Sequence, residues 1–521
     1  MKYFSTRGDP EILSFEETVI RGLAPDGGLY IPTQIPKLPE NWENLWKDFT
    51  FSELSYAVLS LYIPDSEIPP GSLKDIINRS YSTFRDPQVT PLHKINDKLH
   101  ILELFHGPTY AFKDVALQFL GNLFEYFLLR RNVVAKTNPG EKPQRLTILG
   151  ATSGDTGSAA IYGLRSKANI SIIILHPYGR VSPIQEAQMT TVADANVHNL
   201  AVHGTFDDCQ DIVKTCFGDK AFNSKWKLGA VNSINWARIL AQIVYYFSAY
   251  FQAKRNGILD GGKAIQFVVP TGNFGDVLAG FYAKRMGLPT EQLAIATNEN
   301  DILARFWKNG EYTKGKNGVV ETCSPAMDIV VSSNFERLLW YLADESSSEG
   351  RTDGDRQAAC ATVNTWMGQM KANGKVPMPV AVFEQARKDF VAERVSNEET
   401  LETIKSFYQP ESASTPSYIA DPHTAVGLHA AKVFAQTNAP YVVQIVLSTA
   451  HPAKFSEAVT SALQGAPSFN FEQQVLPEEF KGILNMPRRV IEVEKPDYEL
   501  VKQVIEKVAA KDDASLGKES L

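Results

Sequence analysis

From about residue 96 onward, short apolar runs alternate with loops of small residues and with amphipathic stretches. The apolar runs that predict strands cover residues 99–105, 146–149, 170–175, 265–269 and 441–447. The amphipathic stretches that predict helices cover residues 114–129 and 158–164, a stretch ending near residue 286, and another after residue 455. Strands that are apolar throughout and separated by helices are typical of a parallel sheet covered on both faces. The pattern therefore predicts an α/β fold.

The two ends of the chain and one internal stretch depart from this pattern. Residues 1–95 are polar and rich in proline, which predicts an N-terminal cap domain. We expect a catalytic core over residues 96–470, with a small α/β subdomain at about 125–225 and a large subdomain in the remainder. Residues 344–374 are polar and predict a surface insertion, and residues 471–521 predict a C-terminal helical extension.

Length, composition and charge narrow the class of protein. A chain of 521 residues is too long for one ordinary domain, and 44% hydrophobic with 21% charged residues is typical of a globular protein with a large core. The net charge of -7 gives no general attraction to nucleic acids or to anionic membranes. The N-terminus lacks the apolar core of a signal peptide, and no apolar run approaches the roughly 18 residues that span a bilayer. We therefore expect a cytoplasmic protein without nucleic-acid or membrane partners.

The cysteines show no metal-ligand spacing. Cys209, Cys216, Cys323 and Cys360 form no CxxC pair. This distribution is typical of buried or free thiols in a reducing compartment. We expect no metal site.

The loop of residues 271–276 follows a predicted strand and precedes a predicted helix. In open parallel sheets, ligands bind beyond the carboxyl ends of the strands. Glycines allow N–H groups to approach an oxyanion closely, and a helix N-terminus offers further donors and a favourable dipole. The loop suits a phosphate group, although a tight turn from strand to helix would use the same residues. It is not a Walker motif, because no GK[ST] follows.

The loop of residues 151–157 has the same placement and is rich in hydroxyl groups. Such a loop binds a carboxylate through N–H and hydroxyl donors. Its threonine, serine and aspartate residues are equally good helix caps.

Lys113 precedes an apolar helix, and a lysine there is usually solvated. It would act as a Schiff-base nucleophile only if burial or a nearby positive charge kept its amine neutral.

Residues 232–238 open a predicted helix, with Ser233 as its expected N-cap. Arg238 shares a helix face with Gln242 and Tyr245. This face either points to solvent or places the guanidinium at a helix start, where it binds a phosphate through two hydrogen bonds.

Taken together, these loops resemble one family. HGPTYAFKD (106–114), ATSGDTG (151–157), VNSINWAR (231–238), PTGNFGD (270–276) and LSTAHPAKF (447–455) stand in the order found in the fungal and bacterial branch of threonine synthases. The segment SFEETVIRGLAPDGGLYIP (14–32) is similar to the opening of that family, and the similarity extends from about residue 5 to 470. The resemblance implies pyridoxal-phosphate fold type II, similar to the tryptophan synthase beta subunit, with the cofactor between two parallel-sheet α/β domains.

The resemblance also assigns roles to individual positions. Lys113 corresponds to the Schiff-base lysine that binds pyridoxal 5'-phosphate, and Thr449 to the hydroxyl that faces the pyridine nitrogen. A hydroxyl there, rather than a carboxylate, leaves that nitrogen largely unprotonated. Asp155 keeps the pattern of this branch, whereas related enzymes often have asparagine there. The cofactor-phosphate loop is Gly272, Asn273, Phe274, Gly275 and Asp276; the substrate carboxylate corresponds to Thr152, Ser153, Asp155 and Thr156; the substrate phosphate corresponds to Ser233, Asn235 and Arg238.

The implied reaction converts O-phospho-L-homoserine and water to L-threonine and phosphate, the last step of threonine biosynthesis. Lys113 would exchange its bond to the cofactor for the substrate amine and then remove the α-proton. The implied enzyme has a small-molecule substrate and is a monomer or weak homodimer. Two alternatives remain open, a dehydratase or phospho-lyase on the same scaffold and a pyridoxal-phosphate-binding protein without catalysis. The NSINWAR segment argues against a plain dehydratase, and Lys113 argues against a non-catalytic protein.

Overall fold

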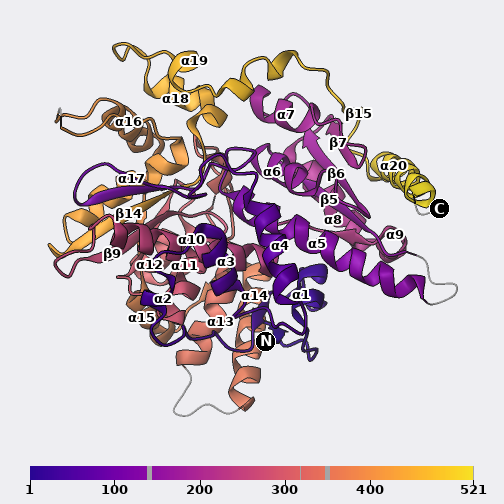
Figure 1. Ribbon diagram of the computed structural model, residues 1–521, viewed down its shortest axis with the longest axis horizontal. Coiled ribbons are helices and arrows are strands. Elements are labelled where there is room, and N and C mark those ends of the chain that lie inside the picture. The colour runs from indigo at the N-terminus through magenta and orange to yellow at the C-terminus, as the bar shows by residue number, and fades with distance from the viewer. Residues whose placement is uncertain (138–142, 317, 347–352, 413, 520–521) are drawn as a thin grey trace. The chain divides into compact units, whose positions relative to one another are not determined.

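A computed structural model describes residues 1–137, 143–316, 318–346, 353–412 and 414–519 of the chain (Figure 1). The chain divides into two compact units. Unit 1 comprises Met1–Lys74, Phe84–His106 and Ser233–Val475, and unit 2 comprises Asp75–Thr83, Gly107–Asn232 and Leu476–Leu521.

Unit 1 is built on a six-stranded sheet of order β13-β10-β9-β14-β4-β3. The strands are β3 (Leu92–Lys94), β4 (Leu99–Glu103), β9 (Ala264–Pro270), β10 (Leu293–Thr297), β13 (Phe390–Arg394) and β14 (Val442–Ser448). All neighbouring strands run parallel except β3, which pairs antiparallel with β4. The sheet is therefore parallel with one antiparallel edge, and the carboxyl ends of β9 and β14 lie at the same side.

Helices cover both faces of this sheet. Val268 of β9 belongs to the core cluster that includes Ala425 and Val426 of α17 (Pro422–Ala435). The neighbouring Phe267 packs instead on Tyr246 of α10 (Trp236–Arg255), with ring centroids 4.9 Å apart. Adjacent residues of a strand point to opposite faces, so α17 and α10 lie on opposite sides of the sheet. This arrangement explains why the strands read as continuous apolar runs.

The remaining elements of unit 1 surround this framework. Its other helices are α1 (Phe15–Arg21), α2 (Trp42–Trp46), α3 (Phe51–Leu59), α11 (Gly275–Met286), α12 (Ile302–Asn309), α13 (Phe335–Ser346), α14 (Asp353–Asn373), α15 (Val380–Asp389), α16 (Asn397–Tyr408), α18 (Ser456–Ala462) and α19 (Phe471–Gln474), with 3-10 turns η1 (Pro325–Met327) and η2 (Pro452–Phe455). Two antiparallel pairs complete it, β1 (Tyr3–Ser5) with β2 (Tyr30–Pro32) and β11 (Glu311–Thr313) with β12 (Lys375–Pro377).

Unit 2 contains a five-stranded parallel sheet of order β15-β7-β6-β5-β8. The strands are β5 (Leu146–Ala151), β6 (Ile170–Pro177), β7 (Val197–Val202), β8 (Leu228–Gly229) and β15 (Ile491–Val493). The helices are α5 (Lys113–Lys136), α6 (Asp155–Leu164), α7 (Pro183–Thr190), α8 (Phe206–Gly218), α9 (Lys220–Trp226) and α20 (Tyr498–Glu519), with 3-10 turns η3 (Glu478–Phe480) and η4 (Ile483–Asn485). The helix α4 (Pro70–Tyr81) contributes residues to both units.

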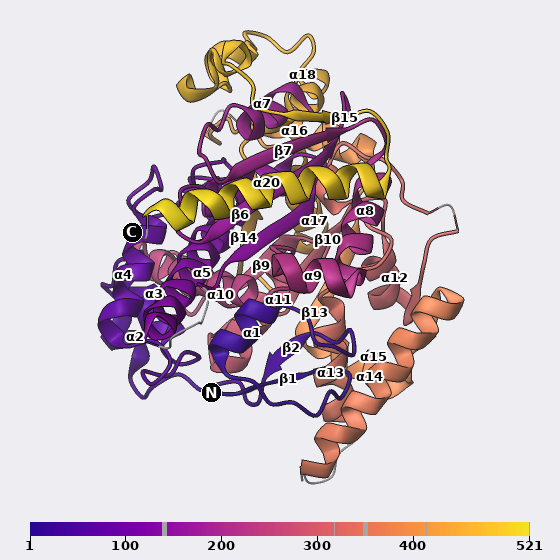
Figure 2. The same cartoon turned by 90° about the vertical axis from the view of Figure 1, so that its right-hand side faces the viewer.

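The C-terminal helix α20 lies along the sheet of unit 2, in front of β6 and β7 in Figure 2. Its residues Val501 and Ile505 join a core cluster with Ile173 of β6, Leu200 of β7 and Cys209 of α8. The strand β15, which precedes α20, pairs with β7. The C-terminal stretch, expected to be a helical extension, thus also contributes a strand at the edge of this sheet.

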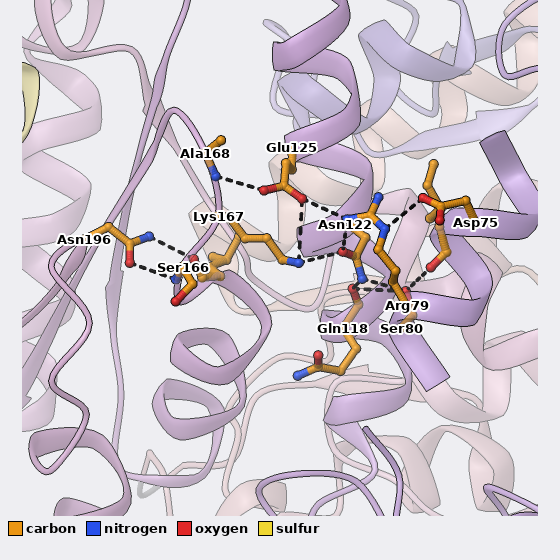
Figure 3. A network of polar contacts seen from close by, with 12 residues as sticks. Asp75, Arg79, Ser80, Gln118, Asn122, Glu125, Ser166, Lys167, Ala168 and Asn196 are labelled. Carbon is orange, nitrogen blue, oxygen red and sulfur yellow. Dashed lines mark hydrogen bonds and ion pairs between the residues drawn. The ribbon is translucent and has the colours of Figure 1, made fainter. Parts of the chain in front are cut away.

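A polar network holds α5 against its neighbours in unit 2 (Figure 3). Asn122 Oδ1 accepts hydrogen bonds from Arg79 Nη1 at 3.0 Å and Lys167 Nζ at 2.6 Å. Glu125 accepts from Arg79 Nη1 at 2.9 Å and from the N–H of Ala168 at 2.9 Å. Since Lys167 and Ala168 lie between α6 and β6, the network joins the middle of α5 to the loop after α6. It thereby fixes the two helices whose first residues are candidate site residues.

The expected subdomain at about residues 125–225 falls within unit 2. The stretch 344–374, expected to be a surface insertion, carries α14, and Ala359 and Val363 of that helix are buried. Residues 347–352 of this stretch lie outside the described residues. Residues 1–74 of the expected N-terminal domain lie in the same unit as the larger sheet.

Metal and membrane features are absent from the described part of the chain. Among those residues, no group of three or more histidine, cysteine or acidic side chains is placed to hold a metal ion. None of the helices described is long and apolar enough to cross a bilayer. All four cysteines are free thiols, and three of them are buried, as expected from their spacing.

Candidate active site

Lys113 and Asp155 meet in the interior of unit 2. Lys113 is the first residue of α5 and Asp155 is the first residue of α6, and each is 8% exposed. Lys113 Nζ lies 2.7 Å from Asp155 Oδ2. The two helices pack with their backbones in contact, because a Cβ atom on Gly121 would lie only 1.9 Å from the carbonyl oxygen of Gly163. Lys113 is therefore a buried, ion-paired lysine rather than a solvated one.

The loop before Lys113 is held by Asp114. Its carboxylate accepts the N–H of Thr109 at 2.7 Å and the hydroxyl of Thr109 at 2.8 Å. A Cβ atom on Gly107 would lie 2.4 Å from Asp114 Cβ, so only glycine allows this approach. Tyr110 takes a left-handed conformation with φ 61°. Sequence reasoning missed the positioning role of Asp114, although the residue stands beside the candidate lysine.

The hydroxyl-rich loop at 151–157 both caps α6 and exposes donors. Thr152 Oγ1 accepts the N–H groups of Gly154 at 3.0 Å and Gly157 at 2.9 Å. Thr152 thus satisfies an N–H group in the first turn of α6, but the N-cap itself is Gly154, so none of the threonine, serine or aspartate residues occupies the N-cap position. Ser153 is exposed and Thr156 is partly exposed. The hydroxyls of Ser153 and Thr156 are thus accessible to a ligand, whereas Thr152 is committed to the loop itself.

In unit 1, the loop at 271–276 forms a cradle of N–H groups. Its carbonyl groups are turned toward residues 332–334, since Gly272 O accepts Ser332 Oγ at 2.6 Å and Asn273 O accepts Asn334 Nδ2 at 3.0 Å. Within the described chain, the N–H groups of residues 272–276 donate to no other residue. Free N–H groups at the start of a helix bind anions. The residues present therefore fit the phosphate group of a cofactor.

Glycine at 272 is required by contact rather than by a positive φ. The left-handed residue of the loop is Phe274, with φ 65°. A Cβ atom on Gly272 would lie 3.0 Å from Met327 Cα and 3.2 Å from Ala326 O.

We expect Gly272→Val to weaken the binding of pyridoxal 5'-phosphate at least tenfold, because the side chain would push the loop away from residues 326–327. Titration of the cofactor-free protein with pyridoxal 5'-phosphate measures this loss. Gly218→Val is the matched control, since Gly218 is exposed and no atom lies within 4 Å of its Cβ position. Unchanged affinity in Gly272→Val would show that the loop has another role.

Asp276 anchors the first turn of α11 to α10. Its Oδ1 accepts the hydroxyl of Tyr245 at 2.5 Å and that of Tyr246 at 3.0 Å. Asp276 is 6% exposed, and among the described residues its Oδ2 atom has no hydrogen-bond partner. Burial raises the pKa of Asp276 to about 7, against the lowering effect of the two tyrosine hydroxyls. The side chain of Asp276 thus stabilises the start of α11 through hydrogen bonds to α10 and does not face solvent.

The raised pKa of Asp276 predicts a pH-dependent stability. A raised folded-state pKa makes the protonated form the stabilised one, so the contribution is complete below about pH 4 and is lost as the pH rises to about 7. The change corresponds to roughly 4 kcal/mol. Asp276→Asn should therefore raise the urea midpoint relative to the parent as the pH increases from 5 to 8. A difference between the two proteins that does not vary with pH would contradict the assignment.

Arg238 is buried, so its interpretation as a solvent-facing residue is wrong. It is 4% exposed, and Gln242 and Tyr245 on the same face are 3% and 0% exposed. Burial lowers the pKa of Arg238 to about 10. The face of α10 that carries these polar residues also adjoins the cofactor-phosphate loop, because a Cβ atom on Gly275 would lie 3.7 Å from Gln242 Oε1. Arg238 thus lies on the same helix face as Gln242, which approaches the loop, and Tyr245, which donates a hydrogen bond to Asp276.

The N-cap of α10 is Asn235, and the expected cap Ser233 is wrong. Asn235 Oδ1 accepts the N–H of Ala237 at 3.1 Å, and its Nδ2 donates to Val19 O at 2.9 Å. Extended backbone at Asn235 (ψ 128°) delays the helix to Trp236. Asn334 Nδ2 donates to Ser233 O at 3.1 Å and to Asn273 O at 3.0 Å. Asn334, which sequence reasoning missed, therefore joins the substrate-phosphate candidates to the cofactor-phosphate loop.

Thr449 directly follows β14, at the carboxyl end of the strand, and is 6% exposed. The candidate site residues are divided between the two units. Unit 1 holds Ser233, Asn235, Arg238, the loop 272–276 and Thr449, and unit 2 holds Lys113, Thr152, Ser153, Asp155 and Thr156.

Comparison with known proteins identifies the family. Three family models match successive parts of the chain: "Threonine synthase N terminus" at residues 2–81, "Pyridoxal-phosphate dependent enzyme" at residues 85–369 and "Threonine synthase, C-terminal" at residues 424–505. The chain is 57% identical to the threonine synthase of Saccharomyces cerevisiae over 98% of both chains. It is 54% identical to that of Schizosaccharomyces pombe over 99% of both. The chain belongs to the threonine synthase family.

Solved structures of threonine synthases agree with this assignment. The crystal structure of threonine synthase from yeast matches with a TM-score of 0.92 and 56% identity, covering 98% of this chain and 99% of that one. The pyridoxal-phosphate-bound threonine synthase from Brucella melitensis matches with a TM-score of 0.85 and 39% identity at the same coverage. The predicted fold type II, with parallel-sheet α/β units, is confirmed. The chain is a pyridoxal-phosphate-dependent lyase of the threonine synthase family.

Proposed function

We propose that this protein converts O-phospho-L-homoserine and water to L-threonine and phosphate, using pyridoxal 5'-phosphate, as the last step of threonine biosynthesis. The observation that carries the proposal is the match to threonine synthase models on both sides of a pyridoxal-phosphate enzyme model. The burial of Lys113 supports it, because desolvation is one of the conditions that make a lysine amine reactive, and the contact with Asp155 holds that amine in one position.

Lys113 is the residue that binds the cofactor covalently and transfers protons. When bound, pyridoxal phosphate withdraws electrons from the substrate Cα and so makes its proton removable. Lys113 Nζ would take that proton as a general base. Asp155, 2.7 Å from Nζ, orients the amine and balances its charge when it is protonated. Both side chains are held by the packing of α5 on α6.

The loop at 272–276 binds the cofactor phosphate through its N–H groups, with the dipole of α11 adding to the attraction. The members of this set are Gly272, Asn273, Phe274, Gly275 and Asp276, of which Asp276 acts through its anchoring on α10. Thr449 would offer a hydroxyl to the pyridine nitrogen, and a hydroxyl, unlike a carboxylate, would leave that nitrogen largely unprotonated.

The substrate is bound at its two charged ends. The carboxylate is assigned to the loop of Thr152, Ser153, Asp155 and Thr156, where the accessible hydroxyls of Ser153 and Thr156 are the direct donors. The phosphate is assigned to Ser233, Asn235 and Arg238. Arg238 is the principal ligand, because a buried guanidinium binds a phosphate with little competition from water. Released phosphate held by Arg238 then helps to activate the attacking water.

The substrate is a small molecule, and the enzyme acts in the cytoplasm as a monomer or weak homodimer without nucleic-acid or membrane partners. For the domains, we propose an N-terminal threonine-synthase domain at 1–95, a catalytic core at 96–470 and a C-terminal extension at 471–521.

A product assay tests the proposal. Incubation of the protein with O-phospho-L-homoserine and pyridoxal phosphate should release threonine and phosphate in equal amounts. A phospho-lyase on the same scaffold would instead release phosphate together with a keto acid. Phosphate release without threonine would overturn the proposed function, and so would the absence of any turnover.

A further inference from the structure

A buried cluster at the start of α17 joins the two loops assigned to the cofactor in unit 1. Its centre is Asp421, the N-cap of α17, which is 1% exposed. The carboxylate uses its two oxygens for two different neighbours. Oδ1 lies 2.8 Å from His423 Nδ1, and Oδ2 accepts the hydroxyl of Thr424. The N–H groups of His423 and Thr424 also donate to this carboxylate, at 2.9 and 3.2 Å, so its position is fixed by the helix start.

The first arm of the cluster runs through His423 to the cofactor-phosphate loop. His423 is 3% exposed, and its Nε2 accepts the N–H of Ala326 at 3.1 Å. An acceptor at Nε2 requires the proton to be on Nδ1, where it is donated to Asp421. The segment of Ala326 and Met327 is the one that backs Gly272, within 3.0–3.2 Å of its Cβ position. His423 thus holds in place the surface against which the loop rests.

The second arm runs through Thr424 to the end of β14. Thr424 Oγ1 lies 2.8 Å from Ser448 Oγ, and both residues are at most 1% exposed. Ser448 is the last residue of β14 and precedes Thr449. It is also held from the other side, since its carbonyl accepts the N–H of Leu104 at 3.0 Å. The second arm therefore fixes the residue before the one assigned to the pyridine nitrogen.

We propose that Asp421, His423 and Thr424 form a positioning device that sets the spacing between the phosphate loop and Thr449, and thereby the span over which the cofactor is held. The inference rests on the proposed function, because it takes the roles of Gly272 and Thr449 from it. The device is rigid: the carboxylate is saturated with donors, the imidazole is bonded at both nitrogens, and its ring packs on Phe455 at a centroid distance of 4.6 Å. None of the three side chains is assigned a contact with substrate.

The side chains of the device allow a matched pair of substitutions. In His423→Gln the longer amide reaches the position of Nε2, and its oxygen accepts the N–H of Ala326. In His423→Asn the shorter amide reaches only the position of Nδ1, so the bond to Asp421 survives and the bond to Ala326 is lost. Each variant thus keeps one of the two side-chain hydrogen bonds of His423: glutamine keeps the bond to Ala326, and asparagine keeps the bond to Asp421. Thr424→Val keeps the shape of the side chain and removes only the hydroxyl of the second arm.

The experiment titrates the cofactor-free full-length protein with pyridoxal 5'-phosphate and with pyridoxal, which lacks the phosphate. We expect His423→Asn to weaken pyridoxal phosphate binding about tenfold and pyridoxal binding much less, since one buried hydrogen bond behind the phosphate loop is lost. His423→Gln should restore affinity to within about threefold of the parent. Thr424→Val should weaken both aldehydes by the same factor and shift the absorption maximum of the bound cofactor, because it displaces Thr449.

His429→Asn is the control for the histidine substitutions. His429 lies on the same helix α17, is only partly buried and contacts Thr403 instead of the cluster. It should leave both affinities unchanged. Equal affinities of His423→Asn and the parent for pyridoxal phosphate, or an equal loss in His423→Gln and His423→Asn, would overturn the first arm.

The remaining outcomes separate this proposal from the proposed function. If His423→Asn does not fold, Thr424→Val decides, and unchanged affinity and spectrum in that variant would overturn the device. A parent protein that fails to bind pyridoxal phosphate at all would refute the proposed function instead. Threonine formation by the parent together with normal cofactor binding in every variant would refute only the positioning device.

Discussion

Replacing Lys113 with alanine is expected to lower the rate of threonine formation by about 10⁴-fold or more, because one substitution removes both the covalent attachment and the general base. Loss of the ammonium group also takes a partner from the buried carboxylate of Asp155. Breaking a buried ion pair in this way costs about 3–5 kcal/mol, so Lys113→Ala should melt at a lower temperature than the parent.

Lys113→Gln separates the two effects. Glutamine keeps a polar side chain of similar volume beside Asp155, yet it has no amine to react with an aldehyde. We expect this variant to be as inactive as Lys113→Ala while its melting temperature lies closer to that of the parent. Activity in Lys113→Gln above that of Lys113→Ala by more than about tenfold would be inconsistent with a chemical role for the amine.

Covalent labelling locates the reactive lysine directly. Borohydride reduction of the cofactor-bound protein, followed by peptide mapping, should place the pyridoxyl group on Lys113. Another buried lysine, Lys454, is 1% exposed and provides the internal comparison. A label on Lys454 or on any other lysine would refute the assignment of Lys113.

The pattern of apolar runs was sufficient to predict the central strands and helices. The strands expected at 146–149, 170–175, 265–269 and 441–447 are β5, β6, β9 and β14, each within two residues at its ends. These strands are buried on both faces, so their residues are apolar throughout and stand out against any polar surroundings. The helix expected at 114–129 begins one residue earlier, at Lys113, and continues to Lys136.

The pattern of apolar and polar positions does not predict the roles of residues that depend on tertiary contacts. Arg238 lies on a helix that is buried all round, and polar residues at helical spacing do not reveal whether they face solvent or an interior loop. Gly272 needs to be glycine because of Met327, which lies 55 residues later in the chain. The cluster at the start of α17 had a local signal, since an aspartate N-cap followed by proline at the first helical position is a helix start. That signal predicts the helix and says nothing of Ala326 or Ser448.

Arg238→Ala is expected to lower kcat/KM by about tenfold to a hundredfold, since a charge-assisted hydrogen bond contributes roughly 1.5–3 kcal/mol. Because Arg238 is buried, little water replaces the lost contact, and we expect a loss in kcat/KM toward the upper end of this range. Arg238→Lys should recover only part of the activity, since an ammonium group does not reproduce the planar fork of a guanidinium. Inhibition by inorganic phosphate should weaken in parallel, because the leaving group and the inhibitor bind the same residue.

Two controls decide whether this loss is specific to phosphate. Arg394→Ala removes an arginine of unit 1 whose side chain is 45% exposed, and it should change neither kcat/KM nor phosphate inhibition. The absorption spectrum of the bound cofactor should be the same in Arg238→Lys and the parent, because Arg238 is assigned to the substrate. Since removal of a buried side chain also leaves a cavity, melting temperatures must accompany the kinetics. If Arg238→Lys matched the parent in kcat/KM and in phosphate inhibition, binding of the phosphate through two guanidinium hydrogen bonds would be excluded. If Arg238→Ala also matched the parent in both measurements, the substrate phosphate would have to be bound by other residues of the chain.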